Sequence, residues 1–339
     1  MVPEIYLFSD LSRLKDGVNE FFKIIAKDFR KTKVGIKIHF GEKGNDTHIN
    51  PELLKDVKKF FPAVFVECNA LYRGSRTVKK DHMAVAKEHG FGFLDIDILD
   101  GDIGDEFVEV PVNLKNIKKA KLGKGITKYN NLIAMSHFKG HIATGFGGAL
   151  KNVGMGLGSR AGKLDMHHGV KIRVEKNKCT GCMTCEKNCP ADAIKVVNKK
   201  AEIDSNVCIG CARCIAVCPS EAVGTDWSSE STTILMEKIA EYALAATKDR
   251  NWWYINFLTN ITLDCDCASI KQKPLMKDVG ILLSKDPVAI DQASVDLLKE
   301  RNKGKDPFIE KGRIDGSQIL KYAESIGLGK RDYELIRIK

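Results

Sequence analysis

The sequence has no uninterrupted apolar stretch that approaches the ~18 residues of a membrane-spanning helix, so no membrane span is expected. Its beginning also lacks a basic segment followed by a long apolar one, which is the pattern of a secretory signal. We therefore expect a cytoplasmic protein. GxSxG, HExxH, Walker A and GxGxxG motifs are absent as well, so no catalytic residue can be assigned from a motif.

Length and composition narrow the classes further. The chain has 339 residues, which at ~150 residues per domain is enough for roughly two domains. Its 43% hydrophobic content permits a sizeable core and excludes a disordered chain, a collagen and a small fold held by disulfides. Lys and Arg number 54 against 44 Asp and Glu, which leaves a net charge of +10.

Charge is segregated along the chain. Residues 88–109 hold eight acidic side chains and no Lys or Arg, whereas residues 110–164 hold ten basic side chains and no acidic one. Such a basic stretch can bind an anion, a phosphorylated ligand or nucleic acid. Nucleic acid is the least favoured, because the aromatic residues there are only Tyr129, Phe138 and Phe146. The alternative is that the lysines of residues 115–128 form a solvated face.

Eleven cysteines are present, and eight of them form a repeat. The pattern C-x2-C-x2-C-x3-C-P occurs at residues 179–190 and again, 29 positions later, at residues 208–219. Gly181 recurs at the same offset as Gly210, so the repeat includes turn residues and predicts two pseudo-symmetric halves. Regular short spacing favours metal ligation over disulfides.

This repeat resembles the bacterial-type ferredoxins that carry two [4Fe–4S] clusters. In that family three thiolates of one motif bind a cluster, and the fourth cysteine ligates the other cluster. The resemblance implies two ligand sets, which are Cys179, Cys182, Cys185 and Cys218 for one cluster and Cys208, Cys211, Cys214 and Cys189 for the other. Zinc is the alternative, because paired CxxC motifs also bind it, but eight cysteines with two prolines fit a ferredoxin better. We expect residues 171–225 to form an α+β ferredoxin-like domain that relays electrons.

The flanks of this segment predict an α/β domain. The β-rich segments and apolar runs are 33–40, 63–67, 131–136, 252–261 and 279–284, and the predicted helices are 51–61, 77–89, 231–246 and 287–301. The simplest architecture is one discontinuous α/β domain, made of residues 1–170 and 226–339, with the ferredoxin-like domain inserted.

A glycine-rich segment ends the basic stretch. Residues 140–162 contain eight glycines, where the chain average of 29 in 339 predicts about two. So many glycines permit positive φ and the close approach of a ligand to backbone N–H groups, as in an oxyanion or phosphate cradle. The polar residues around the segment are His137, His141, Lys151, Asn152, Arg160 and Lys163. The alternative is tight packing of helices and loops.

Three cysteines lie outside the repeat, namely Cys68, Cys265 and Cys267. On a strand, the alternation in residues 263–267 would place the Cys265 and Cys267 thiols on one face. Two thiols on one face can bind a soft metal, and the residues that could complete the site are Cys68, His137, His141, His167 and His168. The alternative is a buried, unreactive thiol, above all for Cys68.

The acidic residues 94–105 lack the spacing of an EF-hand calcium site. Asp95 and Asp97 would share a strand face, but a solvated turn is the simpler expectation. His167 and His168 fall at the boundary of the ferredoxin-like segment, where we expect polar linker residues.

Over nearly its whole length the chain resembles the iron–sulfur proteins of domain of unknown function 362. The segments that carry the resemblance are ECNALYRG at 67–74, HMAVAKEHG at 82–90, LDG at 99–101, HFKGH at 137–141, GFGGALKNVGMG at 145–156, DCDC at 264–267 and VGILLSKDPVAIDQA at 279–293. The resemblance implies that the glycine-rich segment and the Cys265/Cys267 pair belong to one site, and it implies no particular activity. The His, Gly-Gly, Lys, Gly order is also similar to a segment of nickel-dependent lactate racemases.

Two classes of function remain. The first is a redox enzyme or redox partner subunit, in which the ferredoxin-like domain exchanges electrons with a ligand or metal in the α/β domain. The second is a non-catalytic accessory or redox-sensing protein that docks an acidic partner, since residues 170–225 hold nine basic against six acidic side chains. The expected partners are a protein electron donor or acceptor and an anionic small molecule.

Overall fold

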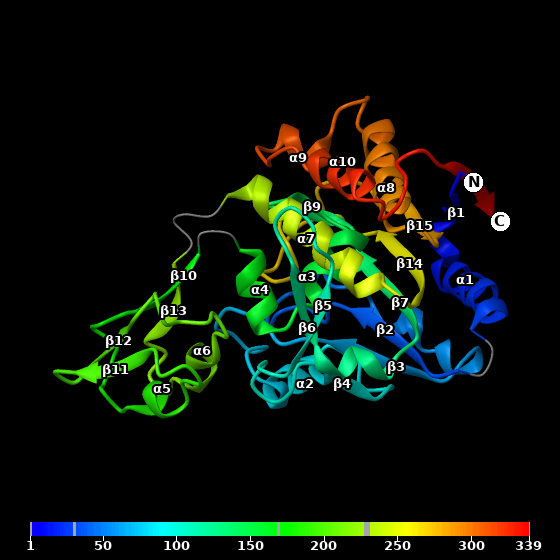
Figure 1. The fold of residues 1–339 in the computed structure, drawn as a ribbon. Coiled ribbons are helices and arrows are strands. Elements are labelled where there is room, and N and C mark those ends of the chain that lie inside the picture. Colours follow the sequence, from blue (N-terminus) through cyan, green and yellow to red (C-terminus); the bar gives the residue numbers. More distant parts are fainter. Residues whose placement is uncertain (1, 30–31, 168–169, 227–230, 339) are drawn as a thin grey trace.

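The computed structural model describes residues 2–29, 32–167, 170–226 and 231–338. A large α/β part carries a smaller lobe on one side (Figure 1). Eight strands of the described residues form one sheet in the order β16-β1-β15-β14-β7-β2-β3-β4. Their bounds are Glu4–Phe8 (β1), Val34–Ile38 (β2), Ala63–Glu67 (β3), Ile96–Ile98 (β4), Asn131–His137 (β7), Asn251–Leu258 (β14), Gly280–Ser284 (β15) and Glu334–Ile338 (β16). Only β15 runs antiparallel to its neighbours, so the α/β prediction is confirmed.

The central strands are buried on both faces, and their side chains alternate between two cores. In β14 one core takes Trp253, Ile255 and Phe257, and the other takes Trp252, Tyr254 and Leu258. Burial on both faces explains why this strand reads as a continuous apolar run rather than as an alternating pattern.

Helices and hairpins cover both faces of the sheet. One face carries α1 (Leu14–Asp28), the 3-10 turns η2 (Pro51–Leu54) and η3 (Val57–Lys59), and α2 (Lys79–Glu88). The other face carries α3 (Ala149–Leu157), α7 (Thr232–Thr247), α8 (Pro287–Arg301), α10 (Ser317–Ser325) and the hairpin of β5 (Phe107–Pro111) and β6 (Lys119–Gly123). Shorter elements are η1 (Leu11–Arg13), η4 (Lys124–Lys128), β8 (Lys139–His141), β9 (Gly145–Gly147), α4 (Arg160–Met166) and α9 (Pro307–Glu310). The sheet is therefore the middle of three layers.

Helix α8 begins and ends where the sequence predicts. The Asp286 carboxylate accepts hydrogen bonds from the amides of Val288 (2.8 Å) and Ala289 (2.9 Å). Pro287 occupies the first helical position, where no amide hydrogen bond is required. The other predicted helices and strands lie within three residues of observed elements at each end, except for the segment 51–61.

The helix predicted at 51–61 is wrong, because the segment forms two 3-10 turns instead. Asp56 separates the turns, and its carboxylate lies 3.3 Å from both the Lys15 ammonium and the Asn19 amide of α1. Leu54 and Val57 are still buried. The apolar residues of this segment are therefore buried by two short turns that pack under α1, and not by one continuous helix.

Residues 171–226 form the small lobe, which repeats its own structure at an offset of 29. The matching elements are β10 (Lys171–Val174) and β12 (Lys200–Ile203), α5 (Thr184–Lys187) and α6 (Arg213–Val217), and β11 (Ile194–Val197) and β13 (Val223–Asp226). β10 pairs with β13 and β11 with β12, both antiparallel. Gly181 and Gly210 have matching left-handed φ angles of 71° and 69°, and so do Met183 (61°) and Ala212 (54°). The sequence repeat is therefore also a repeat of backbone conformation.

One glycine sets how closely α3 and α7 pack. A Cβ atom on Gly154 would lie 2.2 Å from the Ile239 carbonyl oxygen of α7. We expect Gly154→Ala to lower the free energy of unfolding by about 1–3 kcal/mol, the usual cost of overpacking. Gly92→Ala is the control, since its Cβ would meet only the Lys87 side chain at 3.5 Å. Urea denaturation of the two variants checks this, and an equal midpoint in both would contradict it.

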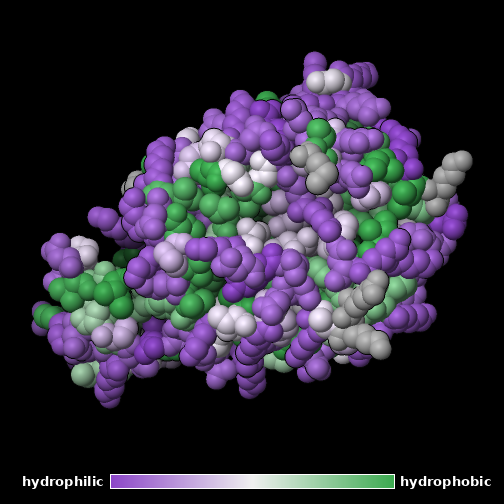
Figure 2. Space-filling view, turned by 45° about the vertical axis from the view of Figure 1, so that its right-hand side comes forward, coloured by the Kyte–Doolittle hydropathy of each residue, from purple (hydrophilic) through white to green (hydrophobic). Residues whose placement is uncertain are grey.

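The surface is mostly hydrophilic, and hydrophobic residues gather on and beside the small lobe (Figure 2). The exposed lysines of residues 115–128 are Lys115, Lys118, Lys119, Lys124 and Lys128. Three of them pair with acidic side chains, for example Lys115 with Glu237 at 2.8 Å. The solvated face is therefore confirmed. Within the described ranges, no helix combines the length and apolar character needed to cross a bilayer.

Candidate functional site

A cavity of about 420 Å³ lies at the carboxyl ends of β2, β3 and β7. The chain leaves β2 toward β3 and β4 but leaves β7 toward β14, so the strand order changes direction between β2 and β7. The crevice at such a switch point is the usual ligand site of an open α/β sheet. Residues at or just after the strand ends line it, among them His39, Cys68 and His137.

The floor of the cavity holds a buried ion pair. The Lys37 ammonium of β2 lies 3.0 Å from the Glu67 carboxylate of β3, and both side chains are almost fully buried. Asn152 of α3 accepts a hydrogen bond from Lys37 at 2.7 Å and donates one to the Met135 carbonyl at 2.9 Å. Burial lowers the pKa of Lys37, although Glu67 opposes that change. Asn152 thus ties α3 to two strands and to the buried cation.

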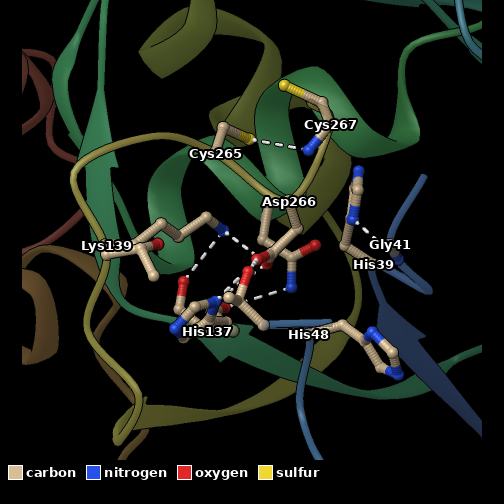
Figure 3. A network of polar contacts seen from close by, with 12 residues as sticks. His39, Gly41, His48, His137, Lys139, Cys265, Asp266 and Cys267 are labelled. Carbon is tan, nitrogen blue, oxygen red and sulfur yellow. Dashed lines mark hydrogen bonds and ion pairs between the residues drawn. The ribbon is translucent and has the colours of Figure 1, made fainter. Parts of the chain in front are cut away.

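Asp266 organises the loop that follows β14. Its fully buried carboxylate lies 2.9 Å from both Thr47 Oγ1 and His137 Nδ1, and 3.5 Å from Lys139 Nζ. Burial opposes ionisation, but His137 and Lys139 hold the pKa of Asp266 well below its ordinary value. Figure 3 shows this side chain pointing toward His137 and Lys139, away from the two flanking thiols.

Those two thiols meet the imidazole of His141, which lies on β8. Each of the three residues offers one possible metal-ligating atom, a sulfur of Cys265 or Cys267 or a ring nitrogen of His141. These three atoms all lie within 4.8 Å of one another. All three side chains line the cavity. The structure therefore brings together three of the residues that the sequence singles out for a second site.

The backbone that carries these thiols is a loop and not a strand. Thr262 Oγ1 donates to the Asp264 carbonyl at 2.8 Å, and the Ala268 amide donates to the Cys265 carbonyl at 2.9 Å. These local bonds curl the chain into turns and prevent extended pairing. Both thiols nevertheless line one cavity, because Asp266 between them is drawn to the opposite side.

The two thiols interact with each other, so their pKa values shift in opposite directions. A side-chain hydrogen bond with Cys267 lowers the pKa of Cys265, against the effect of burial, and Lys151 and Lys139 lower it further. The same hydrogen bond, together with burial, raises the pKa of Cys267.

His141 is held in one orientation by its neighbours. Its Nδ1 lies 3.0 Å from Thr144 Oγ1 and 3.2 Å from the Ala143 amide nitrogen. The Ala143 amide donates to Nδ1, and the Thr144 hydroxyl donates to the Phe146 carbonyl at 2.7 Å. Burial lowers the pKa of His141 well below its usual value. Contacts at Nδ1 thus hold the ring in place, and burial favours its neutral form.

Positive charge dominates the polar lining of the cavity. Its cationic residues are Lys37, Arg76, Lys139, Lys151 and Lys163, against the carboxylate of Glu67. Arg76 pairs with Glu42 at 3.1 Å, and Lys139 pairs with Asp266 at 3.5 Å. Within the described part of the chain, no hydrogen bond or ion pair engages the Lys151 ammonium. The cavity is therefore suited to a ligand that carries negative charge.

The glycine-rich segment packs tightly at several positions and lines the cavity at others. The Ala149 and Leu150 amides at the start of α3 donate to the Asp291 carboxylate of α8, at 2.7 and 2.9 Å. A Cβ on Gly140 would lie 2.2 Å from the Leu263 carbonyl oxygen. An internal carboxylate thus occupies the amides at this helix start, and Gly140 serves tight packing, whereas Gly147, Gly148 and Gly156 of the same segment line the cavity.

Two further predicted residues have structural contacts. Cys68 Sγ is buried 3.5 Å from the Leu157 carbonyl and lies outside the group of three donors, which agrees with the alternative of a buried thiol. His137 uses both ring nitrogens, at Asp266 and at the Asn260 carbonyl (3.1 Å). It positions Asp266 and has no nitrogen left for a metal.

The basic residues of α4 bind backbone carbonyls. Arg160 is fully buried and donates to the carbonyls of Ile103 (3.0 Å) and Leu71 (3.2 Å). Lys163 donates to the Gly158 carbonyl at 2.6 Å. Both therefore tie loops together, although Lys163 also lines the cavity. His167 lines the cavity as well, and His168 lies outside the described residues.

The acidic segment 94–105 is only partly a solvated turn. Asp95 is exposed, but Asp100 is fully buried and accepts hydrogen bonds from the Asn69 amide (2.9 Å) and side chain (3.0 Å). Burial raises the pKa of Asp100 to about 6. The carboxylate of Asp97 pairs with Lys128 at 3.1 Å.

The eight repeat cysteines lie in the small lobe, and their thiols group across the two motifs. One hollow is lined by Cys189, Cys208, Cys211 and Cys214, with Ile172, Ile194, Ile203 and Ile209 nearby. Burial raises the pKa of Cys185, and the neighbouring thiols of Cys218 and Cys179 raise it further. Burial also raises the pKa of Cys214, to about 12. Each group thus contains a cysteine from the other motif.

Residues 71–73 join this lobe to the cavity. Leu71 lines the cavity and also packs in the apolar core of the lobe. The Tyr72 hydroxyl donates to the Cys267 carbonyl at 3.4 Å, and the Arg73 guanidinium donates to the Cys218 carbonyl. These residues belong to the segment 67–74 that carries the family resemblance, but the sequence gives them no evident role.

Several cavity residues escape prediction from the sequence, namely Lys37, His39, Glu67, Arg76 and Lys139. Lys37 and Glu67 do leave a signal, because each is a charged residue near the end of a strand whose other residues are buried. Such a residue at a carboxyl strand end points to a site. Arg76 and Lys139 stand in segments without that pattern.

Comparison with known proteins gives one family and a distant structural likeness. No curated protein matches the sequence. The lactate racemase apoprotein from Thermoanaerobacterium thermosaccharolyticum is similar at 16% identity and a TM-score of 0.37, over 74% of this chain and 50% of that one. This chain thus spans about half the length of that structure. The family described as domain of unknown function (DUF362) matches residues 34–296. Because this match includes most of the chain, the protein belongs to the DUF362 family.

Proposed function

We propose that this protein is an iron–sulfur electron-transfer protein that works as a redox enzyme or as its redox subunit. Two [4Fe–4S] clusters in the small lobe exchange electrons with a ligand or metal in the cavity. The cluster ligands are Cys179, Cys182, Cys185 and Cys218 for one cluster and Cys208, Cys211, Cys214 and Cys189 for the other. The observation that carries the proposal is the grouping of thiols across the two motifs.

The arrangement of these thiols suits clusters better than single ions. Sulfurs that bind different irons of one cluster stand farther apart than donors that share one ion. Among the described residues, only Cys265, Cys267 and His141 form a group of three donors within 4.8 Å. Isoleucines line the hollow of one thiol group and limit the access of water, which affects the potential of a cluster. When bound, such clusters supply one-electron transfer.

Two arginines hold the small lobe against the α/β part. Arg73 donates to the carbonyl of Cys218, and Arg213, next to Cys214, pairs with Asp105. Both contacts lie in the second motif, at or beside cysteines that belong to different proposed ligand sets. Contacts of this kind fix the separation across which an electron passes.

Tyr72 extends this contact into the cavity. From Cys218, the connection runs through Arg73 and the adjoining Tyr72 to the carbonyl of Cys267. A non-catalytic accessory protein needs no connection between its clusters and a positively charged cavity. This connection therefore favours the enzyme or redox-subunit function over the accessory function.

A protein partner would exchange electrons at the outer face of the small lobe. Cys182 of the lobe is exposed, and so are the apolar side chains of Met183, Val207 and Ile209. Apolar side chains beside a redox centre suit a transient docking surface. The lobe also has more basic than acidic residues, which suits an acidic partner.

Iron and acid-labile sulfide in anaerobically purified protein test the proposal. Two clusters predict about eight iron and eight sulfide per chain. Reduction with dithionite should give the EPR signal of reduced [4Fe–4S] clusters, broadened by interaction between the two. Cys68→Ser is the matched control, because this thiol is buried outside the lobe, and it should retain all the iron. Purified protein with zinc in place of iron and sulfide would refute the proposal.

A further inference from the structure

Three metal-binding side chains meet in the cavity, outside the small lobe. His141 of β8 and the loop residues Cys265 and Cys267 each bring a donor atom into a group that spans at most 4.8 Å. We propose that these residues bind one thiophilic divalent transition-metal ion, such as zinc or iron(II), with one coordination position open to the cavity. This inference rests on the proposed function in one respect, because it names what the cavity holds.

The donor set has the composition of a catalytic metal site. Two thiolates and one imidazole are the three protein ligands of some catalytic zinc sites, in which the fourth position takes water or substrate. With Zn–S bonds of ~2.3 Å, the sulfurs of a tetrahedral site lie about 3.8 Å apart. A group within 4.8 Å reaches this spacing by a small movement of the loop.

Surrounding contacts hold each donor in place. Contacts to the second ring nitrogen usually orient a metal-binding histidine, and His141 Nδ1 accepts from the Ala143 amide (3.2 Å) and lies 3.0 Å from Thr144 Oγ1. Asp266 anchors the backbone between the two cysteines through His137 and Thr47. Figure 3 shows the result, with the Asp266 side chain on one side of the loop and the thiols on the other.

The open position faces the uncompensated positive charge of the cavity. A divalent ion bound by two thiolates has no net charge, so it leaves the charge of Lys151 unbalanced. In the residues that the structure describes, the ammonium of Lys151 has no polar partner, and Lys151 lines the same cavity as the three donors. The ligand at the open position is therefore an oxyanion, such as a carboxylate, that bridges the ion and Lys151.

Cys68 provides a matched thiol outside the proposed site. It lines the same cavity, but its sulfur contacts the Leu157 carbonyl and lies outside the donor group. Replacing Cys68 therefore removes a cavity thiol without removing a ligand.

Zinc binding by the anaerobic, iron-loaded protein tests the site. The protein is treated with a chelator under conditions that leave its iron content unchanged and is then titrated with Zn2+. The wild-type protein should bind about one zinc per chain, with X-ray absorption showing two sulfurs at ~2.3 Å and a nitrogen at ~2.0 Å. Cys265→Ser, Cys267→Ser and His141→Ala should each bind zinc at least tenfold more weakly. Cys68→Ser should bind it as the wild type does.

Iron and zinc are measured on the same samples, so the two proposals fail separately. Equal zinc affinity in the wild type and the three ligand variants would overturn the metal site. A wild type that keeps its iron but binds no zinc would also overturn it and would leave the iron–sulfur function intact. A protein that binds one zinc through these residues but contains no iron would support the site and refute the clusters.

Discussion

Replacing Cys189 and Cys211 together with alanine is expected to leave about four iron atoms per chain, whereas replacing Cys189 and Cys182 together is expected to leave almost none. The reason is that Cys189 lines the same hollow as Cys211, although the two belong to different motifs. The first pair thus removes two ligands from one cluster. The second pair removes one ligand from each cluster.

These two double variants are closely matched, because each lacks two repeat cysteines. Iron and sulfide analysis of both proteins, with circular dichroism to show that each is folded, measures the difference. The opposite pattern, with the iron kept when Cys189 and Cys182 are replaced and lost when Cys189 and Cys211 are replaced, would mean that each motif binds its own cluster. The grouping proposed for the small lobe would then be wrong.

Asp266→Ala is expected to lower the free energy of unfolding by about 3–5 kcal/mol, the usual cost of breaking a buried charge pair. The variant leaves Lys139 and His137 buried without their carboxylate. The variant also removes the anchor of the loop between Cys265 and Cys267. We therefore expect it to bind zinc more weakly as well as to be less stable. Urea denaturation of the anaerobic protein gives the first effect, and a zinc titration gives the second.

The pH dependence of this stabilisation follows from the pKa of Asp266, which lies well below its ordinary value of 3.8 in the folded protein. A carboxyl group with a depressed pKa stabilises the fold at pH values above its unfolded pKa, and that contribution is lost as the pH falls toward the folded pKa. The difference in stability between wild type and Asp266→Ala should therefore be full at neutral pH and shrink below about pH 4.

Asp264→Ala is the control for this prediction. Asp264 lies two residues away in the same loop, but its carboxylate is more than a third exposed and pairs with Arg313. Exposed ion pairs contribute about 0–1 kcal/mol, so this change should have a small effect. If the two variants unfold at the same urea concentration, Asp266 is not the anchor of the loop.

The strands that carry the site are predictable because burial on both faces gives continuous apolar runs. Residues 63–67 and 131–136 have this pattern, and they become the two parallel strands on either side of β2, both of which end at the cavity. The helix at 287–301 is predictable for a local reason, since Asp286 and Pro287 mark its start. These features depend on residues that are close together in the sequence.

The lining of the cavity is less predictable, because its contacts join distant segments. Lys37 meets Glu67 and Asn152 across the sheet, and no local pattern specifies those partners. The Cys265/Cys267 pair shows the same limit. Alternation indicates two thiols on one side, but the loop conformation depends on Asp266, whose partner His137 is more than a hundred residues away.

The high number of glycines in residues 140–162 is ambiguous in a similar way. It indicates that something approaches the backbone closely, but not whether that group is a ligand or the protein itself. At Gly140 the approaching atom is the Leu263 carbonyl oxygen, and at the start of α3 it is the Asp291 carboxylate. Both partners come from the second half of the chain, beyond the reach of a local pattern.

The first and last strands lie side by side, since β1 pairs in parallel with β16 at the edge of the sheet. In Figure 1 this edge is opposite to the small lobe. A tether fused next to either strand would therefore immobilise the protein with the lobe facing away from the support. If the lobe holds the proposed clusters, that orientation would slow direct electron exchange with an electrode but leave the lobe open to a soluble partner protein. A tether placed on the lobe itself would reverse both effects.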